Sequence, residues 1–198
     1  MRPERICALT LAAMLTASAA HAADALDLAR KLVRYTGGVS LILHNFQGGM
    51  AASFAAPDIF KQSFDQALAD NGKLLAAADE DLAKAYAKSY PADLMANEVA
   101  FYESPEAQAI MTKSRENFGA VVWPDPGSPD LTPEQSAALV KFHAMVKQRA
   151  AIAAQNSDAA DAIMTAETDA LVKIRAAAFA NYCKLRDCKA EGVTPPPQ

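Results

Sequence analysis

Apolar residues recur every three or four positions along most of this 198-residue chain, and this spacing constrains its fold more than any other feature. Residues at such steps share one face of a helix, and that face has to be buried against another element. The sequence shows neither strand-like alternation nor an internal repeat of fixed period. The pattern therefore predicts an all-α protein, a single irregular bundle of about six or seven helices with no sheet.

Residues that favour helix ends separate the apolar stripes. Gly37-Gly38 interrupts the pattern early in the chain, and Gly72 is expected to end a helix in the left-handed cap conformation. Phe46 belongs to one inward-facing stripe, and the neighbouring His44 is expected to be a surface or hydrogen-bonded residue rather than a ligand. The predicted helices cover residues 24–35, 39–54, 57–70, 73–89, two segments on either side of residue 104, 132–155 and 159–184.

A corner that begins with a proline lies at the centre of the predicted bundle. Phe101 and Tyr102 end the apolar face of one helix. Ser104 then suits the N-cap of the next helix, and Pro105 suits its first position, where no amide hydrogen bond is lost. Two aromatic residues directly before a capped corner are expected to pack both helices into one core.

The same corner resembles the signature of a known protein family. The matching residues are Asp93-Leu94, then Phe101-Tyr102-x-Ser104-Pro105-x-x-Gln108, then Lys113. They are similar to the motif of a family of exported, all-helical bacterial domains whose function is unknown, over residues 82–118. Members commonly have glycine where this chain has Ala107. The resemblance implies an exported α-helical protein and implies no activity.

The N-terminus has the parts of a secretory signal peptide. Arg2 and Arg5 precede an apolar run over residues 6–20, and Ala20-His21-Ala22 supplies a cleavage site of small residues. The run of about 15 residues is short for a membrane span. We therefore expect a signal peptide over 1–22, a helical domain over 23–189 and a disordered proline-rich tail over 190–198. The expected location is outside the cytoplasm, in the periplasm of a Gram-negative cell.

Charge excludes two classes of partner. Without residues 1–22 the chain keeps 17 basic and 22 acidic residues, a net charge of −5. No cluster of Lys or Arg stands out, so nucleic-acid binding and attraction to anionic lipid are not expected. No later run of 18 apolar residues exists, so no membrane span is expected after cleavage.

Cys183 and Cys188 are the only cysteines after the leader, and an oxidising compartment favours a disulfide between them. On a continuous helix they would point about 140° apart, so the last helix is expected to end between Lys184 and Asp187. A redox-active pair is disfavoured because the spacing is not C-x-x-C. Two thiols without a nearby histidine do not complete a zinc site either, and no metal or cofactor is expected.

Three further side chains are candidates for chemistry. Glu98 and Glu167 fall on apolar stripes, and a buried acid needs a partner or a raised pKa. An ion pair is favoured over a catalytic role with His143. The possible partners of these acids are Arg115, Arg149 and Arg175.

The only tryptophan, Trp123, lies in a proline-rich segment over 121–130. A recognition role would use its large apolar area, but packing onto the end of the helical core is favoured because Val121 and Val122 also need burial.

These observations leave three functions open, with no catalytic motif among them. The first is a non-enzymatic binding or interaction protein of the cell envelope, working through a helical surface or groove. The second is a carrier of a small apolar ligand held between helices, which alanine-rich stripes could leave room for. The third is an enzyme with an unfamiliar site built from Glu98 or Glu167 with His143.

Overall fold

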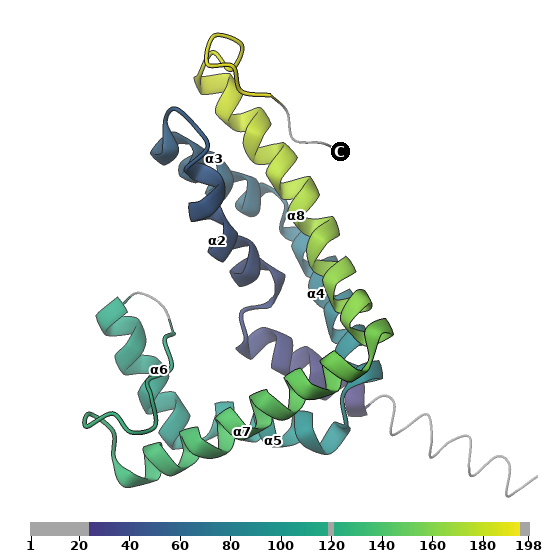
Figure 1. Ribbon diagram of the computed structural model, residues 1–198, viewed down its shortest axis with the longest axis vertical. Coiled ribbons are helices and arrows are strands. Elements are labelled where there is room, and N and C mark those ends of the chain that lie inside the picture. Colours follow the sequence, from purple (N-terminus) through teal and green to yellow (C-terminus); the bar gives the residue numbers. More distant parts are fainter. Residues whose placement is uncertain (1–23, 119–120, 195–198) are drawn as a thin grey trace, which may run out of the picture. The chain divides into compact units, whose positions relative to one another are not determined.

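The computed structural model describes residues 24–118 and 121–194 (Figure 1). Within these residues every regular element is a helix and no strand occurs, which confirms the all-α prediction. Residues 24–35 are helical, and seven helices follow: α2 (Gly38–Ala51), α3 (Pro57–Asp70), α4 (Gly72–Ser89), α5 (Ala92–Glu103), α6 (Pro105–Phe118), α7 (Pro133–Gln155) and α8 (Ser157–Leu185). The predicted signal peptide and residues 195–198 of the predicted tail lie outside the described residues.

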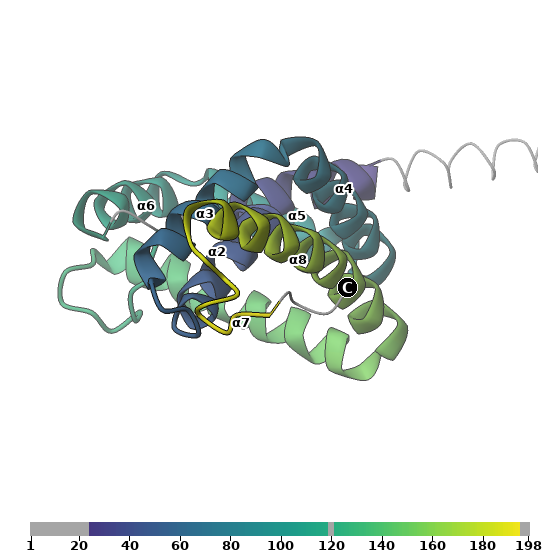
Figure 2. The same ribbon diagram turned by 90° about the horizontal axis from the view of Figure 1, so that it is seen from above.

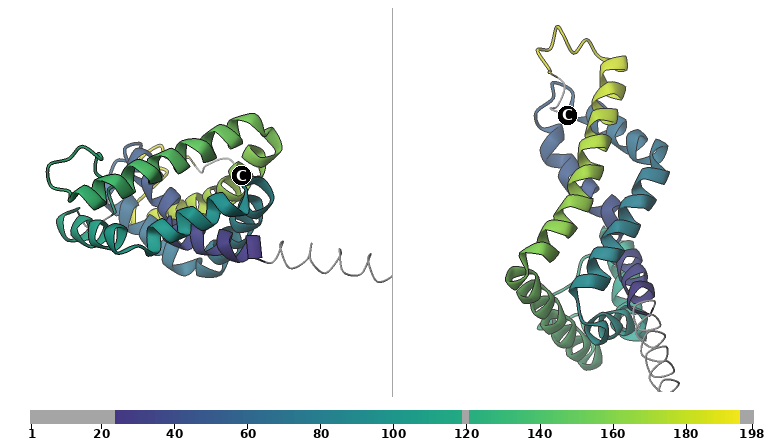
Figure 3. Two further views of the ribbon diagram at one scale, coloured as in Figure 1. Left: turned by 90° about the horizontal axis from the view of Figure 1, so that it is seen from below. Right: turned by 90° about the vertical axis from the view of Figure 1, so that its right-hand side faces the viewer.

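Two compact units make up the described chain. The first unit holds the residues up to Leu32 and Tyr86–Ser157, and the second holds Val33–Ala85 and the residues from Asp158 onward. In the first unit α5, α6 and α7 pack against one another, and Figure 3 shows α5 and α7 side by side. In the second unit α2 packs against α3.

Helix ends largely follow the predicted caps. Thr132 begins α7 with a full capping box, in which its hydroxyl accepts the Gln135 N–H and the Gln135 side chain accepts the Thr132 N–H. Gly72 differs from the prediction, because it opens α4 and does not adopt a positive φ. The single residue Asn71 separates α3 from α4, so no left-handed cap is needed there.

The break at Gly37-Gly38 has a specific cause. Both glycines have positive φ angles, 83° and 57°, which favour glycine. The Asp79 carboxylate accepts the Val39 N–H at 2.7 Å, and a Cβ on Gly38 would collide with that carboxylate. Asp79 therefore satisfies a free amide at the start of α2.

The inward face of α2 includes Val39 and Leu43 but departs from the predicted stripe at Phe46. Phe46 is 54% exposed, while the adjacent Gln47 is buried. The Gln47 amide donates to the Lys61 carbonyl at 2.9 Å and to the Asp65 carboxylate at 2.8 Å. Because these two bonds replace the water that the amide loses, a polar residue is stable on the buried face.

Candidate functional site

The aromatic corner between α5 and α6 is closed by hydrogen bonds from its own motif residues. The Ser104 hydroxyl accepts the Ala107 N–H at 3.2 Å, as an N-cap should. The Gln108 side chain donates to the Tyr102 carbonyl at 2.6 Å, which satisfies a carbonyl at the end of α5. Pro105 opens α6, so the cap, the first helical residue and the Gln108 side chain together define the corner.

An aromatic cluster fills this corner. Phe101 stacks on Phe142 of α7 with ring centroids 4.2 Å apart, and Tyr102 meets Phe142 edge-on at 5.5 Å. Trp123 is half-buried against Phe101, Tyr102 and Phe142, with centroid distances between 5.2 and 5.9 Å. These contacts show the indole packed on the helical core; a recognition role for it stays a prediction.

We call residues 121–132 the proline loop, and hydrogen bonds hold it to both flanking helices. The Ser114 hydroxyl of α6 accepts the Val122 N–H at 2.6 Å and donates to the Val122 carbonyl at 3.1 Å. The Ser136 hydroxyl of α7 donates to the Pro126 carbonyl at 2.5 Å. Within the loop the Asp125 carboxylate accepts the Gly127 N–H at 2.8 Å. The loop is therefore a fixed wall beside α6.

A cavity of about 300 Å³ lies between α6 and the proline loop. Its floor is apolar and buried at Ile110, and its mouth is exposed and charged at Lys113 and Asp130. The complete lining is Ala109, Ile110, Lys113, Ser114, Asn117, Val122, Pro124, Ser128, Asp130, Leu131 and Gln135. An apolar floor with a few polar groups at the mouth is the usual composition of a small-molecule site.

A second, more open hollow of about 560 Å³ lies between α5 and α7, beside Phe101 and Lys141. Polar atoms make up a larger share of its lining than of the lining of the cavity beside α6. We therefore regard the cavity beside α6 as the candidate binding site.

Glu98 is fully buried in the same unit and forms the predicted ion pair with Arg149. The Arg149 Nη1 lies 3.1 Å from the Glu98 Oε2, and the Arg149 guanidinium also lies over the Tyr86 ring, 5.6 Å from its centroid. The ion pair lacks hydrogen-bond geometry, so within the described residues neither carboxylate oxygen has a hydrogen bond. Burial raises the pKa of Glu98, and the charge of Arg149 opposes the rise only in part. Burial likewise raises the pKa of Tyr102 to about 12.

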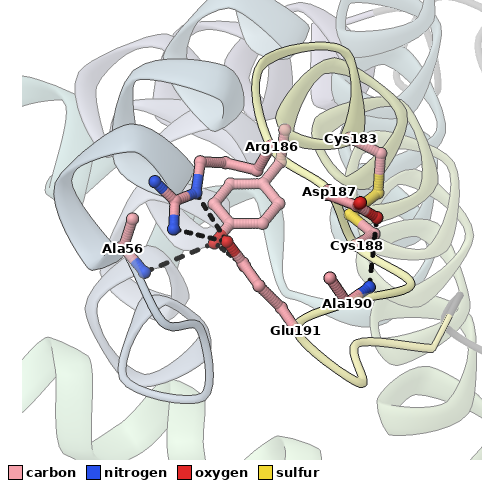
Figure 4. The surroundings of a disulfide bond; sticks show 8 residues. Ala56, Cys183, Arg186, Asp187, Cys188, Ala190 and Glu191 are labelled. Atoms are coloured by element: carbon pink, nitrogen blue, oxygen red, sulfur yellow. Dashed lines mark hydrogen bonds and ion pairs between the residues drawn. A yellow bond between two sulfur atoms is a disulfide. The ribbon is translucent and has the colours of Figure 1, made fainter.

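The second unit has its own buried aromatic group. Phe54 stacks on Phe60 at 3.9 Å, and Tyr182 meets both rings edge-on. The buried Tyr182 hydroxyl accepts the Ala56 N–H at 3.3 Å and donates to the Glu191 carboxylate at 2.7 Å. Arg186 donates to the same carboxylate from its Nε at 2.6 Å. Figure 4 shows Arg186 and Glu191 directed toward each other near Ala56.

The Cys183–Cys188 disulfide closes a short loop that includes Arg186. The two Cα atoms lie 5.4 Å apart, and α8 ends at Leu185, inside the range that the sequence predicts. The chain after α8 then turns back (Figure 2). Residues 190–194 were expected in a disordered tail, but Glu191 is held by Tyr182 and Arg186, and Val193 N–H donates to the Cys188 carbonyl at 2.9 Å.

In the first unit neither a hydrogen bond nor an ion pair joins Glu98 to His143 within the described residues. Glu98 contacts Arg149, and His143 of the same unit contacts the Phe142 ring. Glu167 belongs to the second unit, where it is half-buried and burial raises its pKa. His44 is exposed and lies 3.8 Å from the Asp65 carboxylate, which agrees with a surface role.

Several site residues escape sequence reasoning. Ser114 and Asp130 carry no signal beyond their polarity. Lys113 belongs to the family motif, which assigns it no role, and only the fold brings α6 and the proline loop face to face. No group of three His, Cys, Asp or Glu side chains suited to a metal occurs within the described ranges. None of the helices in that part of the chain has the length and apolar character to cross a membrane.

Comparison of the whole chain with models of protein families, with curated proteins and with solved structures finds no match.

Proposed function

We propose that this chain is an exported binding protein without enzymatic activity, and that it holds a small ligand in the cavity between α6 and the proline loop. The proposal is carried by one observation, namely a cavity whose loop wall is hydrogen-bonded to both flanking helices. Ser114 and Ser136 bond the loop to the helices on both sides. A pre-formed wall spares a ligand the entropic cost of ordering its own site.

Export is supported by the leader pattern and by the disulfide. Disulfides persist mainly in oxidising compartments, of which the periplasm is one. The resemblance of residues 82–118 to a family of exported helical domains also supports export. Location in the periplasm of a Gram-negative cell is part of this proposal.

The absence of an enzymatic role is proposed because the fully buried acid has a structural environment. Glu98 is buried in an ion pair with Arg149. A general acid or base has to reach the reacting atoms, which a fully buried carboxylate in an ion pair does not.

A small ligand is favoured over a protein partner because the cavity has a buried floor at Ile110. The test is native mass spectrometry of the protein purified from its own envelope. We expect a small retained mass that is lost in Ala109→Phe, where the new ring fills the cavity from an exposed position on α6.

The matched control is Thr112→Phe, an exposed position on the same helix outside the cavity lining. It should retain the mass. If both variants keep the ligand, the cavity is not its site. If no mass is retained and cross-linking in envelope extracts captures one protein, the partner-protein alternative replaces this proposal.

A further inference from the structure

We propose that the cavity between α6 and the proline loop binds a small zwitterion with an apolar side chain, of which an apolar α-amino acid is the simplest. The ligand carboxylate lies toward Lys113 and its ammonium group toward Asp130. This inference rests on the proposed function, because it names the ligand chemistry of the same cavity.

The size of the cavity sets the size of the ligand. Its volume of about 300 Å³ equals on the order of ten water molecules at about 30 Å³ each. A ligand of roughly ten non-hydrogen atoms fits that space, which corresponds to an amino acid with a branched aliphatic side chain.

The interior of the cavity selects an apolar body. Ile110 is buried at its floor, and Leu131 of the proline loop lines it from the opposite side. Val122 also lines the cavity, and it is 52% exposed. A bound apolar group would remove this side chain from water and gain the corresponding hydrophobic free energy.

The mouth of the cavity carries one charge of each sign on opposite walls. Lys113 lies one turn beyond Ile110 on α6, and Asp130 lies on the proline loop. Neither forms an ion pair with the other or with any other group in the part of the chain that the structure describes. Both charges are therefore available to a ligand.

This pair of charges decides between ligand classes. A simple carboxylate would gain from Lys113 but would meet the negative charge of Asp130, and a simple amine would have the reverse problem. A zwitterion places its carboxylate near Lys113 and its ammonium group near Asp130 at the same time. Asn117 and Ser128, which also line the cavity, add side chains that can donate to a carboxylate or accept from an ammonium group.

The test uses four probes that share one branched side chain: L-leucine, 4-methylpentanoate, 3-methylbutylamine and 3-methylbutan-1-ol. Binding is followed by Trp123 fluorescence and by the NMR signal of the Ile110 methyl groups. We expect leucine to bind most tightly, and each singly charged probe to bind about fivefold more weakly. That factor is the upper range for ion pairs at an exposed mouth.

Charge variants assign each end of the ligand. Lys113→Met should weaken leucine about fivefold and leave 3-methylbutylamine bound at least as tightly as before. Asp130→Asn should weaken leucine similarly and spare 4-methylpentanoate. Lys141→Met is the control, because Lys141 lines the separate hollow between α5 and α7; it should leave the affinities for all four probes unchanged.

Two failures are distinguishable. If the neutral alcohol binds as tightly as leucine, the zwitterion inference is wrong while the cavity remains a binding site. If no probe shifts either signal up to the solubility of leucine, and no mass is retained in the native spectrum, the inference and the proposed function both fail.

Discussion

Both compact units combine a tyrosine, a glutamate and an arginine, yet the two sets put the carboxylate in opposite environments. The inner triad is Tyr102, Glu98 and Arg149 of the first unit, and the outer triad is Tyr182, Glu191 and Arg186 of the second. In the inner triad the carboxylate is fully buried and lacks hydrogen bonds within the described chain. In the outer triad the carboxylate lies near the surface and accepts bonds from both partners.

The pKa of the glutamate moves in opposite directions as a result. Burial raises the pKa of Glu98 because the charged form loses its hydration. The hydrogen bond from Tyr182 lowers the pKa of Glu191, with a further contribution from Arg186. An opposite charge nearby is thus not enough to stabilise a carboxylate; donors with good geometry have to replace the water that it loses.

The largest expected effect comes from removing the cation of the inner triad. Arg149→Met leaves the buried Glu98 carboxylate without an opposite charge, and we expect the first unit to lose about 3 kcal/mol of unfolding free energy at pH 7. Trp123 is the only tryptophan and lies in this unit, so its fluorescence during urea unfolding measures the change.

The control for this variant is the double substitution Glu98→Leu with Arg149→Leu. It removes both charges and should lie within about 1 kcal/mol of the wild type. A single variant that loses less than about 1 kcal/mol would mean that Glu98 is already protonated at pH 7, and the contrast between the triads would weaken.

The disulfide beside the outer triad gives the next largest effect. Replacing Cys183 and Cys188 by serine frees a short loop, and the loop-entropy relation predicts a loss of about 2 kcal/mol. Far-UV circular dichroism should show the loss in the second unit. The Trp123 transition should not move if the units unfold separately; a matching shift there would show that they unfold together.

Local features of the fold were predictable because they depend on neighbouring residues. The caps at Ser104 and Thr132 follow from residue type and spacing alone. The end of α8 before Cys188 follows from the angle between two positions on a helix. Local geometry therefore supplied most helix boundaries and the disulfide.

Features that depend on distant contacts were not predictable. Phe46 was expected inside, whereas Gln47 takes the buried position, because the partners that satisfy Gln47 come from α3. Glu191 was expected in a disordered tail, because the side chains that hold it, Tyr182 and Arg186, lie outside that tail. The candidate cavity has the same origin, since the fold alone sets Lys113 opposite Asp130.

A smaller effect is expected from the tyrosine of the outer triad. Tyr182→Phe keeps the ring contacts with Phe54 and Phe60 but removes the acceptor of the Ala56 N–H and the donor to Glu191. We expect a loss of about 1 kcal/mol in the circular dichroism transition. Combined with Glu191→Gln the losses should not add, because the two residues share one hydrogen bond; full additivity would show that this bond contributes nothing.

The smallest effects are the pH slopes, and they separate the two glutamates by sign. The pKa of Glu98 is raised above its ordinary value of 4.5, so the native state binds more protons and stability falls as pH rises from 4.5 through the raised pKa. The pKa of Glu191 is lowered, so its contribution is present above 4.5 and is lost as pH falls through the lowered pKa.

Glu98→Gln should therefore flatten the slope of unfolding free energy above pH 4.5, and Glu191→Gln should flatten it below that value. Urea midpoints measured by circular dichroism across both ranges test the pair, and each variant is the control for the other. Both substitutions remove one carboxylate and keep the size of the side chain. An effect of net charge alone would therefore change the pH profiles of the two variants in the same way. If both slopes change below pH 4.5, hydrogen bonding controls both carboxylates, and if both change above it, burial controls both. Either result would remove the distinction between the triads.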